Sequence, residues 1–407
     1  MLAILYQMGR AQQAVEGKLI ATIPIASPCH GTFPSITFDA DKCAEFQANW
    51  SRPEFYDETT HSPVASFFAN KSATPSLLAM LVWTHHIKDR SILDYDSASY
   101  TGKAMKIGAG VQASEAQATA NSQYYVVVEG DCPTSGLAAD RVLEWELVTG
   151  KGELLTATPN QNSDLYWALA VGEGGIYDVV LSMTGKLHKN IPTAGATLTF
   201  MEPSDRYWDV VQIFLVNMPV VLKLFLLIDF PAFQDAFFTL NPDMDITEIN
   251  LGGNLKPYSF VASNSSATSL VSSIKSILSN DVILVDISMD VSQKPTYPGA
   301  AHPAWRSSLF LAFLGTIYNR SNFTANILGQ KTATNVLDPA LERLTPDLNE
   351  ADLHQPNWQQ GFYGTNYTKL RSIKNKYDLN DIFWGPTVVG REAWATAVDG
   401  RLCKTGY

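Results

Sequence analysis

The segment Lys106–Leu187 alternates strand-like and helix-like patterns, and this alternation constrains the fold more than any other feature of the chain. Apolar and polar residues that alternate with a period of two predict half-buried strands, and runs of small residues between them predict short helices. Glycine turns separate the elements. The predicted strands are Lys106–Val111, Tyr124–Val128, Val142–Val148 and Val179–Lys186, and the predicted helices are Ser114–Ala120 and Asp164–Leu169, the latter capped by Ser163. We therefore expect a compact α/β unit here.

The composition is that of a packed globular protein. With 407 residues, of which 46% are hydrophobic and 17% charged, the chain is long enough for two domains or for one large α/β unit with an inserted sheet. The net charge of −11 has the wrong sign for neutralising phosphates, so we expect no nucleic-acid partner. The stretch Val210–Phe230 is apolar, but Pro219, Lys223 and Asp229 interrupt it, which favours buried elements over a membrane span. Val282–Met289 is a further predicted strand.

The four cysteines are too few for a disulfide scaffold, but Cys29 and Cys43 are spaced to form one local bridge. Glycosylation sequons would matter only in a secretory compartment. Met1–Tyr6 is apolar, yet polar residues follow too soon for a signal peptide, so the localisation stays open. The candidate glycosylation sites are Asn49, Asn70, Asn264, Asn319 and Asn322, with a sixth sequon at Asn366.

Two glycine clusters could hold a phosphate-bearing cofactor. Gly108-Ala109-Gly110 ends a predicted strand, and Gly174-Gly175 precedes another; glycine lets backbone amides approach a pyrophosphate closely. Tight turns without a ligand are at least as common, so the pattern alone is weak. Adjacent His85 and His86 on a strand point to opposite faces, and no zinc, α/β-hydrolase or P-loop motif occurs, so we expect no metal site.

Two further segments carry chemistry-bearing side chains. Cys132 lies in a turn directly after an apolar strand, where an ordinary semi-buried thiol is the alternative to a reactive one. Near the C terminus, Tyr363 and Tyr367 precede apolar residues at helical spacing. The segment is either an amphipathic helix that closes the core or a pair of phenols aimed at a pocket, where a tyrosine with a lowered pKa can accept a proton.

Taken together, these motifs resemble the FAD-linked oxidases of the berberine-bridge-enzyme and vanillyl-alcohol-oxidase group, within it the fungal branch similar to isoamyl alcohol oxidase. The most specific match is the run Y-G-T-N-Y-T-K-L-R-S-I-K-N-K-Y-D. Matching segments cover roughly half of the chain in family order. They are Lys18–Trp50, Leu81–Gln112, Val126–Leu187, Pro303–Arg306 and Asn349–Cys403.

The resemblance implies an α+β protein: a PCMH-type two-subdomain FAD-binding fold with an antiparallel-sheet substrate domain, incomplete in the N-terminal FAD subdomain. It implies an N-terminal extension over 1–70, an FAD-binding domain over 71–190, a substrate domain over 191–345, and a C-terminal segment over 346–407 that returns to the FAD domain. It also implies a monomer that acts on a small-molecule substrate with O₂, without a membrane partner.

The same resemblance implies the site. Cys132 occupies the position that carries a covalent flavin bond in part of the family, whereas the usual histidine link is absent. Tyr363 and Tyr367 match the motif that faces the ring and the substrate, where FAD removes a hydride and a phenolate accepts the proton. The implied cofactor-binding residues are Gly108, Ala109, Gly110, Cys132, Gly174, Gly175, Val179 and Asn366.

The chain also departs from the family pattern. A whole βαβ unit of the family is absent between Asn70 and Leu81, and a G-G-G-H loop is absent after Gly136. Glu173 and Asp178 stand where the family prefers glycine. Two hypotheses follow: a flavoprotein oxidase of fungal secondary metabolism whose sequence has lost internal segments, or a non-catalytic remnant that keeps the shell of the fold without FAD.

Overall fold

The computed structural model forms two compact units, one from Met1–His85 with Trp394–Tyr407 and the other from His86–Ala393. The domain boundaries expected from the sequence stay predictions. The structure describes residues 27–29, 38–48, 84–128, 137–172, 174–190, 205–224, 249–278, 282–288, 291–317, 322–343, 345, 356–385, 387–396 and 402–405.

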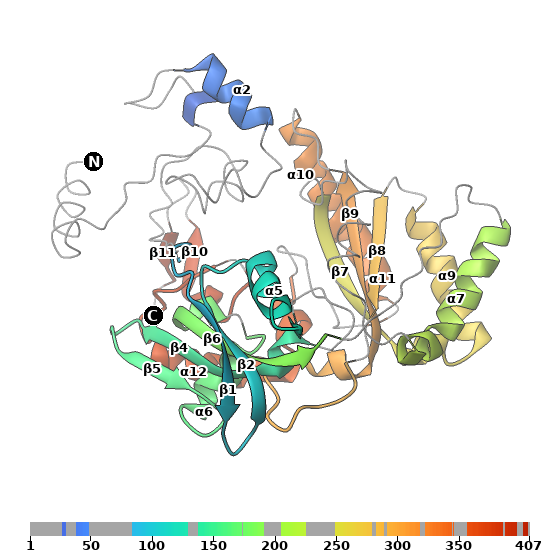
Figure 1. Ribbon diagram of the computed structural model, residues 1–407. Helices are drawn as coiled ribbons and strands as arrows, with labels where there is room; N and C mark the ends of the chain where they lie inside the picture. Colours follow the sequence, from blue (N-terminus) through green and yellow to red (C-terminus); the bar gives the residue numbers. More distant parts are fainter. Residues whose placement is uncertain are drawn as a thin grey trace. The chain divides into compact units, whose positions relative to one another are not determined.

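An antiparallel sheet organises the first half of the larger unit (Figure 1). Its strands run in the order β1-β2-β6-β4-β5, and β3 pairs with the far end of β6. The two long central strands pair through Val142↔Gly185, which brings segments over 40 residues apart into contact. The strands are β1 (Arg90–Asp96), β2 (Thr101–Gly108), β3 (Tyr125–Val127), β4 (Val142–Thr149), β5 (Leu154–Ala157) and β6 (Asp178–Lys189).

Helices from distant parts of the chain cover this sheet. A buried cluster joins α6 to α12 through Leu165, Leu370 and Ile373, and a smaller one joins α5 to β2 and β3. The amphipathic C-terminal helix predicted from the sequence is therefore present and closes the core. These elements are α5 (Ala113–Asn121), η2 (Ala138–Arg141), α6 (Ser163–Leu169), η3 (Gly174–Ile176), η8 (Gln359–Tyr363), η9 (Gly364–Asn366), α12 (Tyr367–Tyr377) and η10 (Arg391–Ala393).

A second antiparallel sheet, in the order β7-β9-β8, has its own apolar core. Leu270, Leu309 and Leu314 are fully buried there, between the sheet and the neighbouring helices. The helix α7 occupies most of the predicted buried stretch, and no helix within the described ranges combines the length and hydrophobicity that a bilayer span requires. The elements are α7 (Asp205–Leu224), β7 (Ile249–Pro257), η5 (Tyr258–Val261), α9 (Asn264–Leu278), β8 (Val282–Ser288), η6 (Pro303–Ser307), β9 (Ser308–Ile317), α10 (Phe323–Thr332), η7 (Ala333–Leu337) and α11 (Asp338–Glu342).

In the smaller unit a disulfide joins Cys29 and Cys43, whose Cα atoms lie 4.9 Å apart. The first lies in η1 (Ser27–Cys29) and the second in α2 (Ala40–Ala48), while β10 (Trp394–Thr396) and β11 (Leu402–Lys404) form a hairpin. Of the five candidate glycosylation sites, Asn264 and Asn322 are exposed. The other three, at positions 49, 70 and 319, lie outside the described residues.

Two local predictions were wrong. The first predicted strand ends at Gly108 instead of Val111, because the next two residues turn away to bond Leu181 and Ile87. The second is the helix cap: Ser163 is already helical, and Asn162 is the N-cap, in the left-handed region at φ 47°. The Asn162 amide donates to the Thr156 carbonyl at 2.8 Å, which compensates for this conformation.

Candidate functional site

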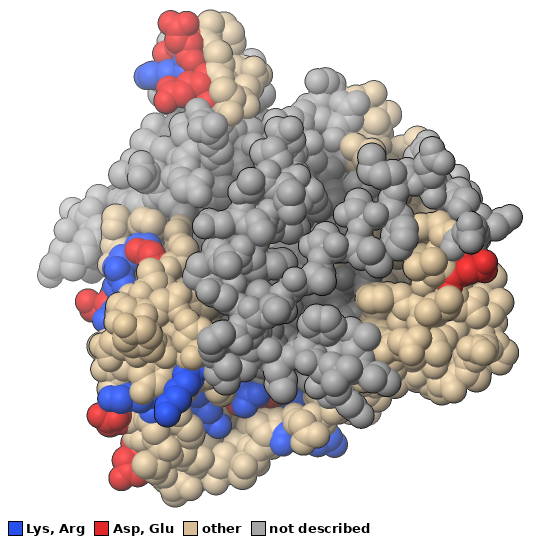
Figure 2. Space-filling model, turned by 45° about the vertical axis from the view of Figure 1, so that its right-hand side comes forward, with Lys and Arg blue, Asp and Glu red and all other residues tan. Residues whose placement is uncertain are grey.

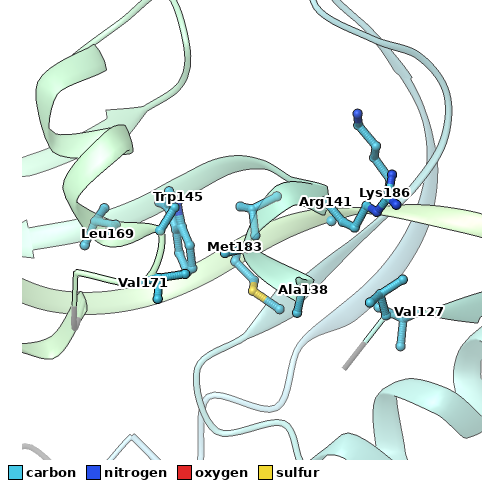
Figure 3. Close-up of a pocket in the computed structure, with 13 residues that line it drawn as sticks. Val127, Ala138, Arg141, Trp145, Leu169, Val171, Met183 and Lys186 are labelled. Carbon is cyan, nitrogen blue, oxygen red and sulfur yellow. The ribbon is translucent and has the colours of Figure 1, made fainter. Parts of the chain in front are cut away.

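A pocket of about 150 Å³ opens beside the main sheet (Figure 3). Its walls are mostly apolar and come from β3, η2, β4, β6 and the residues that follow α6. Figure 3 places Trp145, Leu169 and Val171 at one end and Arg141 and Lys186 at the other. The lining residues are Val127, Val128, Ala138, Ala139, Arg141, Val142, Trp145, Leu169, Ala170, Val171, Met183, Gly185 and Lys186.

The residues on either side of the segment that carries the predicted flavin-linking cysteine both line this pocket. Val128 and Ala138 line it, and residues 129–137 connect them along the chain. Cys132 itself is outside the described residues, so its role stays a prediction.

One end of the pocket is basic. Burial lowers the pKa of Lys186, and the nearby Arg141 guanidinium lowers it further. The same two cations lower the pKa of His188, whose main depression comes from burial. The neighbouring carboxylate, Asp140, is already engaged, since Arg306 donates to both of its oxygens at 2.7 and 2.8 Å. Two cations, Arg141 and Lys186, thus line this end of the pocket.

The Trp145 side chain lines the opposite end of the pocket. Its indole Nε1 is buried and has no hydrogen-bond acceptor in the described part of the chain. A buried N–H without an acceptor is costly, because it has lost its water.

The first glycine cluster does not offer donors to a phosphate. The backbone N–H groups of Gly108, Ala109 and Gly110 donate to the carbonyls of Asp89, Leu181 and Ile87, respectively, at 2.8 to 3.0 Å. A Cβ at Gly108 would come within 2.3 Å of a backbone oxygen. Glycine is needed at position 108 for close packing of the chain against itself, and the cofactor contact expected of these three residues stays a prediction.

The second cluster lies in η3, the turn that precedes β6. Gly175 faces open space, Gly174 packs near Leu169, and Val179 pairs with Val148 in the sheet. Beside them Asp178 is only 1% exposed, and neither carboxylate oxygen meets a donor within the described ranges. Burial raises its pKa to about 8.

The predicted catalytic segment is tightly packed. The Tyr363 hydroxyl donates to the Thr387 carbonyl at 3.2 Å, and its ring lies 5.8 Å from that of Tyr367. Asn366 donates to the carbonyls of Ala300 and Ala301, so it holds a loop in this structure. The same loop reaches the pocket wall, because the Ala300 N–H donates to the Ala170 carbonyl at 2.7 Å.

The surroundings of Tyr367 disfavour the phenolate that is expected from the sequence. Burial raises its pKa to about 12, and the hydrogen bond that its hydroxyl donates to Glu392 at 2.7 Å adds to the effect. Arg371 lies 3.4 Å from the other oxygen of this carboxylate. The phenol is thus a donor at neutral pH, and the lowered pKa expected from the sequence is wrong for this structure.

Sequence reasoning missed Arg141, Trp145, Lys186 and His302 as parts of this region. His302 accepts the Ala304 N–H through Nδ1, and its ring fills the space beside Gly364, whose φ is +54°. The one local sequence feature that marks this region is Gly364, which lies between Tyr363 and Tyr367 and adopts a left-handed conformation. Among the described residues, no group of three His, Cys, Asp or Glu side chains gathers as metal ligands would.

Comparisons with known proteins found a matching family model and similar solved structures. The family model described as "Berberine and berberine like" matches residues 348–389, which include the two tyrosines and α12. The VAO-type flavoprotein MtVAO615 from Myceliophthora thermophila has a similar structure, with a TM-score of 0.79 and 26% identity over 98% of this chain and 97% of its own.

Curated relatives match nearly the whole chain. The FAD-linked oxidoreductase sor8 of Hypocrea jecorina is 32% identical over 96% of this chain and 90% of its own, and ZEB1 of Gibberella zeae is 29% identical over 96% and 91%. The alignment with sor8 spans 520 positions and this chain has 407 residues, so at least 113 positions (520 less 407) face a gap in this chain. With its α+β fold and these matches, the chain belongs to the FAD-linked oxidoreductases of the berberine-bridge-enzyme and vanillyl-alcohol-oxidase group.

Proposed function

We propose that this oxidoreductase removes a hydride from an alcohol or another activated C–H of a small molecule and passes the electrons to O₂. The observation that carries the proposal is the match to FAD-linked oxidoreductases along almost the entire chain. A role in fungal secondary metabolism, a secretory location and a monomeric state belong to the same proposal, as do the domain boundaries expected from the sequence.

The described residues fit part of an FAD molecule. The apolar pocket suits a ring, and the cations Arg141 and Lys186 line one end of it. The volume of about 150 Å³ is the size of a cavity that holds one benzene-like ring, so these residues alone do not enclose the whole cofactor. The backbone N–H groups of Gly108, Ala109 and Gly110 add no hydrogen-bond donors to this fit, because they already donate to main-chain carbonyls.

When bound, FAD supplies the hydride acceptor of the reaction. The chain positions the reactants and manages the proton. Because the Tyr367 phenol stays protonated, Glu392 is the proton-accepting end of the Tyr367–Glu392 pair, and Arg371 holds its carboxylate in place. Asn366 and the Ala300 loop connect this pair to the wall of the pocket.

The covalent bond through Cys132 is tested by acid precipitation of the purified protein. A yellow pellet is expected from the unmodified chain, and Cys132→Ala should release the colour into the supernatant. A matched control is Cys403→Ala, because Cys403 is an exposed free cysteine. Colour that stays in the Cys132→Ala pellet would count against this link.

A non-catalytic remnant is the second candidate. The gap of at least 113 aligned positions and the engaged amides of Gly108–Gly110 favour it. The two candidates differ in turnover: the oxidase produces hydrogen peroxide with one of a panel of small alcohols, in proportion to the substrate consumed. A folded chain that binds no FAD and makes no peroxide with any alcohol of the panel would support the remnant.

A further inference from the structure

A single loop contacts two separate segments of the pocket wall. The loop comprises residues 291–307, between β8 and β9, and the two wall segments are 138–142 and 169–171. Figure 3 places Arg141 toward one end of the pocket and Val171 toward the other. No residue of the loop is among those that line the pocket in the described part of the chain. The loop therefore contacts the pocket indirectly, through these two segments.

The first contact is an ion pair between Arg306 of the loop and Asp140. The guanidinium donates to both carboxylate oxygens, at 2.7 and 2.8 Å, and the two side chains are only 12% and 8% exposed. Asp140 stands between Ala139 and Arg141, which both line the pocket. Two parallel hydrogen bonds fix the orientation of a carboxylate as well as its distance. The pair therefore fixes the position of η2, which belongs to the first wall segment.

Arg306 also holds the loop in its conformation. Its Nη1 atom donates to the Val291 carbonyl at 3.0 Å and to the Gln293 carbonyl at 3.4 Å. Surface cations, such as those gathered along the lower part of the face in Figure 2, are solvated by water. A guanidinium as buried as that of Arg306 instead depends on acceptors of the protein. Removing it would therefore free both η2 and the beginning of the loop.

The second contact is a main-chain hydrogen bond. The N–H of Ala300 donates at 2.7 Å to the carbonyl of Ala170, a residue that lines the pocket. A Cβ at Gly299 would overlap Ala170, so the approach is as close as glycine allows. In addition, the Asn366 amide donates to the carbonyls of Ala300 and Ala301. The loop is thus held to the second wall segment and to η9 at once.

We propose that Arg306 is a positioning residue of the candidate site, and that it fixes the spacing of the two wall segments through the loop. It does not line the pocket: it acts through Asp140 on one wall and through the conformation of residues 291–300 on the other. The proposal rests on the proposed function only in taking this pocket as the ligand site. Because the contacts belong to the chain alone, the proposal is tested without substrate and without cofactor.

Hydrogen exchange of the cofactor-free full chain, measured by mass spectrometry with fragmentation to single residues, tests the proposal. Two backbone amides report on the walls: that of Asp140, which donates to the Leu137 carbonyl, and that of Ala300, which donates to Ala170. The exchange rate of an amide follows the free energy of the local opening that exposes it. We expect Arg306→Gln to speed exchange at both amides by at least about tenfold, because a hydrogen bond to a charged group is worth at least this factor.

Three variants separate the steps. Asp140→Asn removes the ion pair but leaves the contacts of Arg306 within the loop, so it should speed exchange at position 140 and leave the Ala300 amide unchanged. Arg306→Lys keeps a cation and should restore part of the protection at both amides, relative to Arg306→Gln. Lys294→Gln is the matched control: Lys294 is an exposed cation of the same loop, and its removal should change neither amide.

Faster exchange of Arg306→Gln at position 140 alone would overturn the proposal, since the loop would then not join the two walls. The same conclusion follows if neither amide changes, or if all amides of β4 and β6 accelerate equally, which indicates a general loss of stability. If Arg306→Gln does not fold, the comparison of Arg306→Lys with Lys294→Gln gives the same decision. The oxidase function fails separately: a folded chain that binds no FAD contradicts it and leaves the exchange measurement intact.

Discussion

The buried ion pair between Lys374 and Asp378 joins the C-terminal helix to the turn before β6. The Lys374 ammonium is 1% exposed and donates to the Ile176 carbonyl at 2.5 Å, the Asp378 carboxylate at 2.6 Å and the Phe383 carbonyl at 2.6 Å. Burial lowers the pKa of Lys374, while the bond to Asp378 opposes that effect. We expect Lys374→Met to be strongly destabilising.

The magnitude follows from what the substitution leaves behind. Asp378 would stay fully buried without its cation, with the two backbone N–H groups of Ile382 and Phe383 as its remaining donors. Removing one member of a buried pair costs about 3–5 kcal/mol, a large part of the total stability of about 5–15 kcal/mol for a typical domain. The additional variant Asp378→Asn keeps an acceptor for both N–H groups and removes the charge.

Urea unfolding followed by circular dichroism measures these effects. Lys374→Met should lower the free energy of unfolding by about 3 kcal/mol or more, and Lys374→Met with Asp378→Asn should recover part of the loss. Lys376→Met is the control, because Lys376 is 59% exposed in its pair with Asp164 and should cost less than about 1 kcal/mol. Equal losses for Lys374→Met and Lys376→Met would refute the reasoning.

Three further predictions concern backbone conformation and buried charge. Gly364→Ala should lower the melting temperature more than Gly152→Ala, because both have positive φ but only the first would place a Cβ 2.6 Å from His302; similar losses would contradict this. Burial raises the pKa of Asp178 from 3.8 in the unfolded chain to about 8 in the folded chain. The stability that this group contributes is therefore fully present below pH 3.8 and is lost as the pH rises through 8. Asp178→Asn should therefore exceed the native chain in stability at pH 8 by more than about 1.4 kcal/mol, with little difference at pH 4; no difference at pH 8 would refute the shift. Burial lowers the pKa of Lys256 from 10.5 to about 7. The free energy of unfolding of the native chain, measured with urea, should therefore rise between pH 7 and 10 relative to that of Lys256→Met. Parallel pH profiles of the two proteins would refute this.

The sequence predicted part of the main sheet and its helices, because strand alternation and helical spacing are local signals. It carried no prediction for β1 and β5, and β2 begins at Thr101, five residues before the predicted strand. Val142–Val148 became β4 and Ser114–Ala120 became α5 with shifts of one residue at the ends. The cap at Asn162 was missed, since its left-handed conformation depends on a hydrogen bond six residues back. Local propensity cannot anticipate such a bond.

The candidate site was predicted less completely. Arg141 and Lys186 are 45 positions apart in the numbering and meet only through the register of β4 and β6. The cofactor contact of Gly108 and Gly110 stays a prediction, and the sequence does not show that their backbone amides donate to main-chain carbonyls. The buried environment of Tyr367, which reverses its expected pKa shift, likewise arises from packing between distant segments.

The most direct test of the account is the amount of FAD that the full chain holds. The purified protein, incubated with excess FAD and freed of unbound cofactor by gel filtration, should show the visible absorbance of oxidised flavin at about one FAD per chain. This absorbance should bleach when an oxidisable substrate is added without oxygen. A folded but colourless chain after this treatment would contradict a flavin-dependent oxidoreductase.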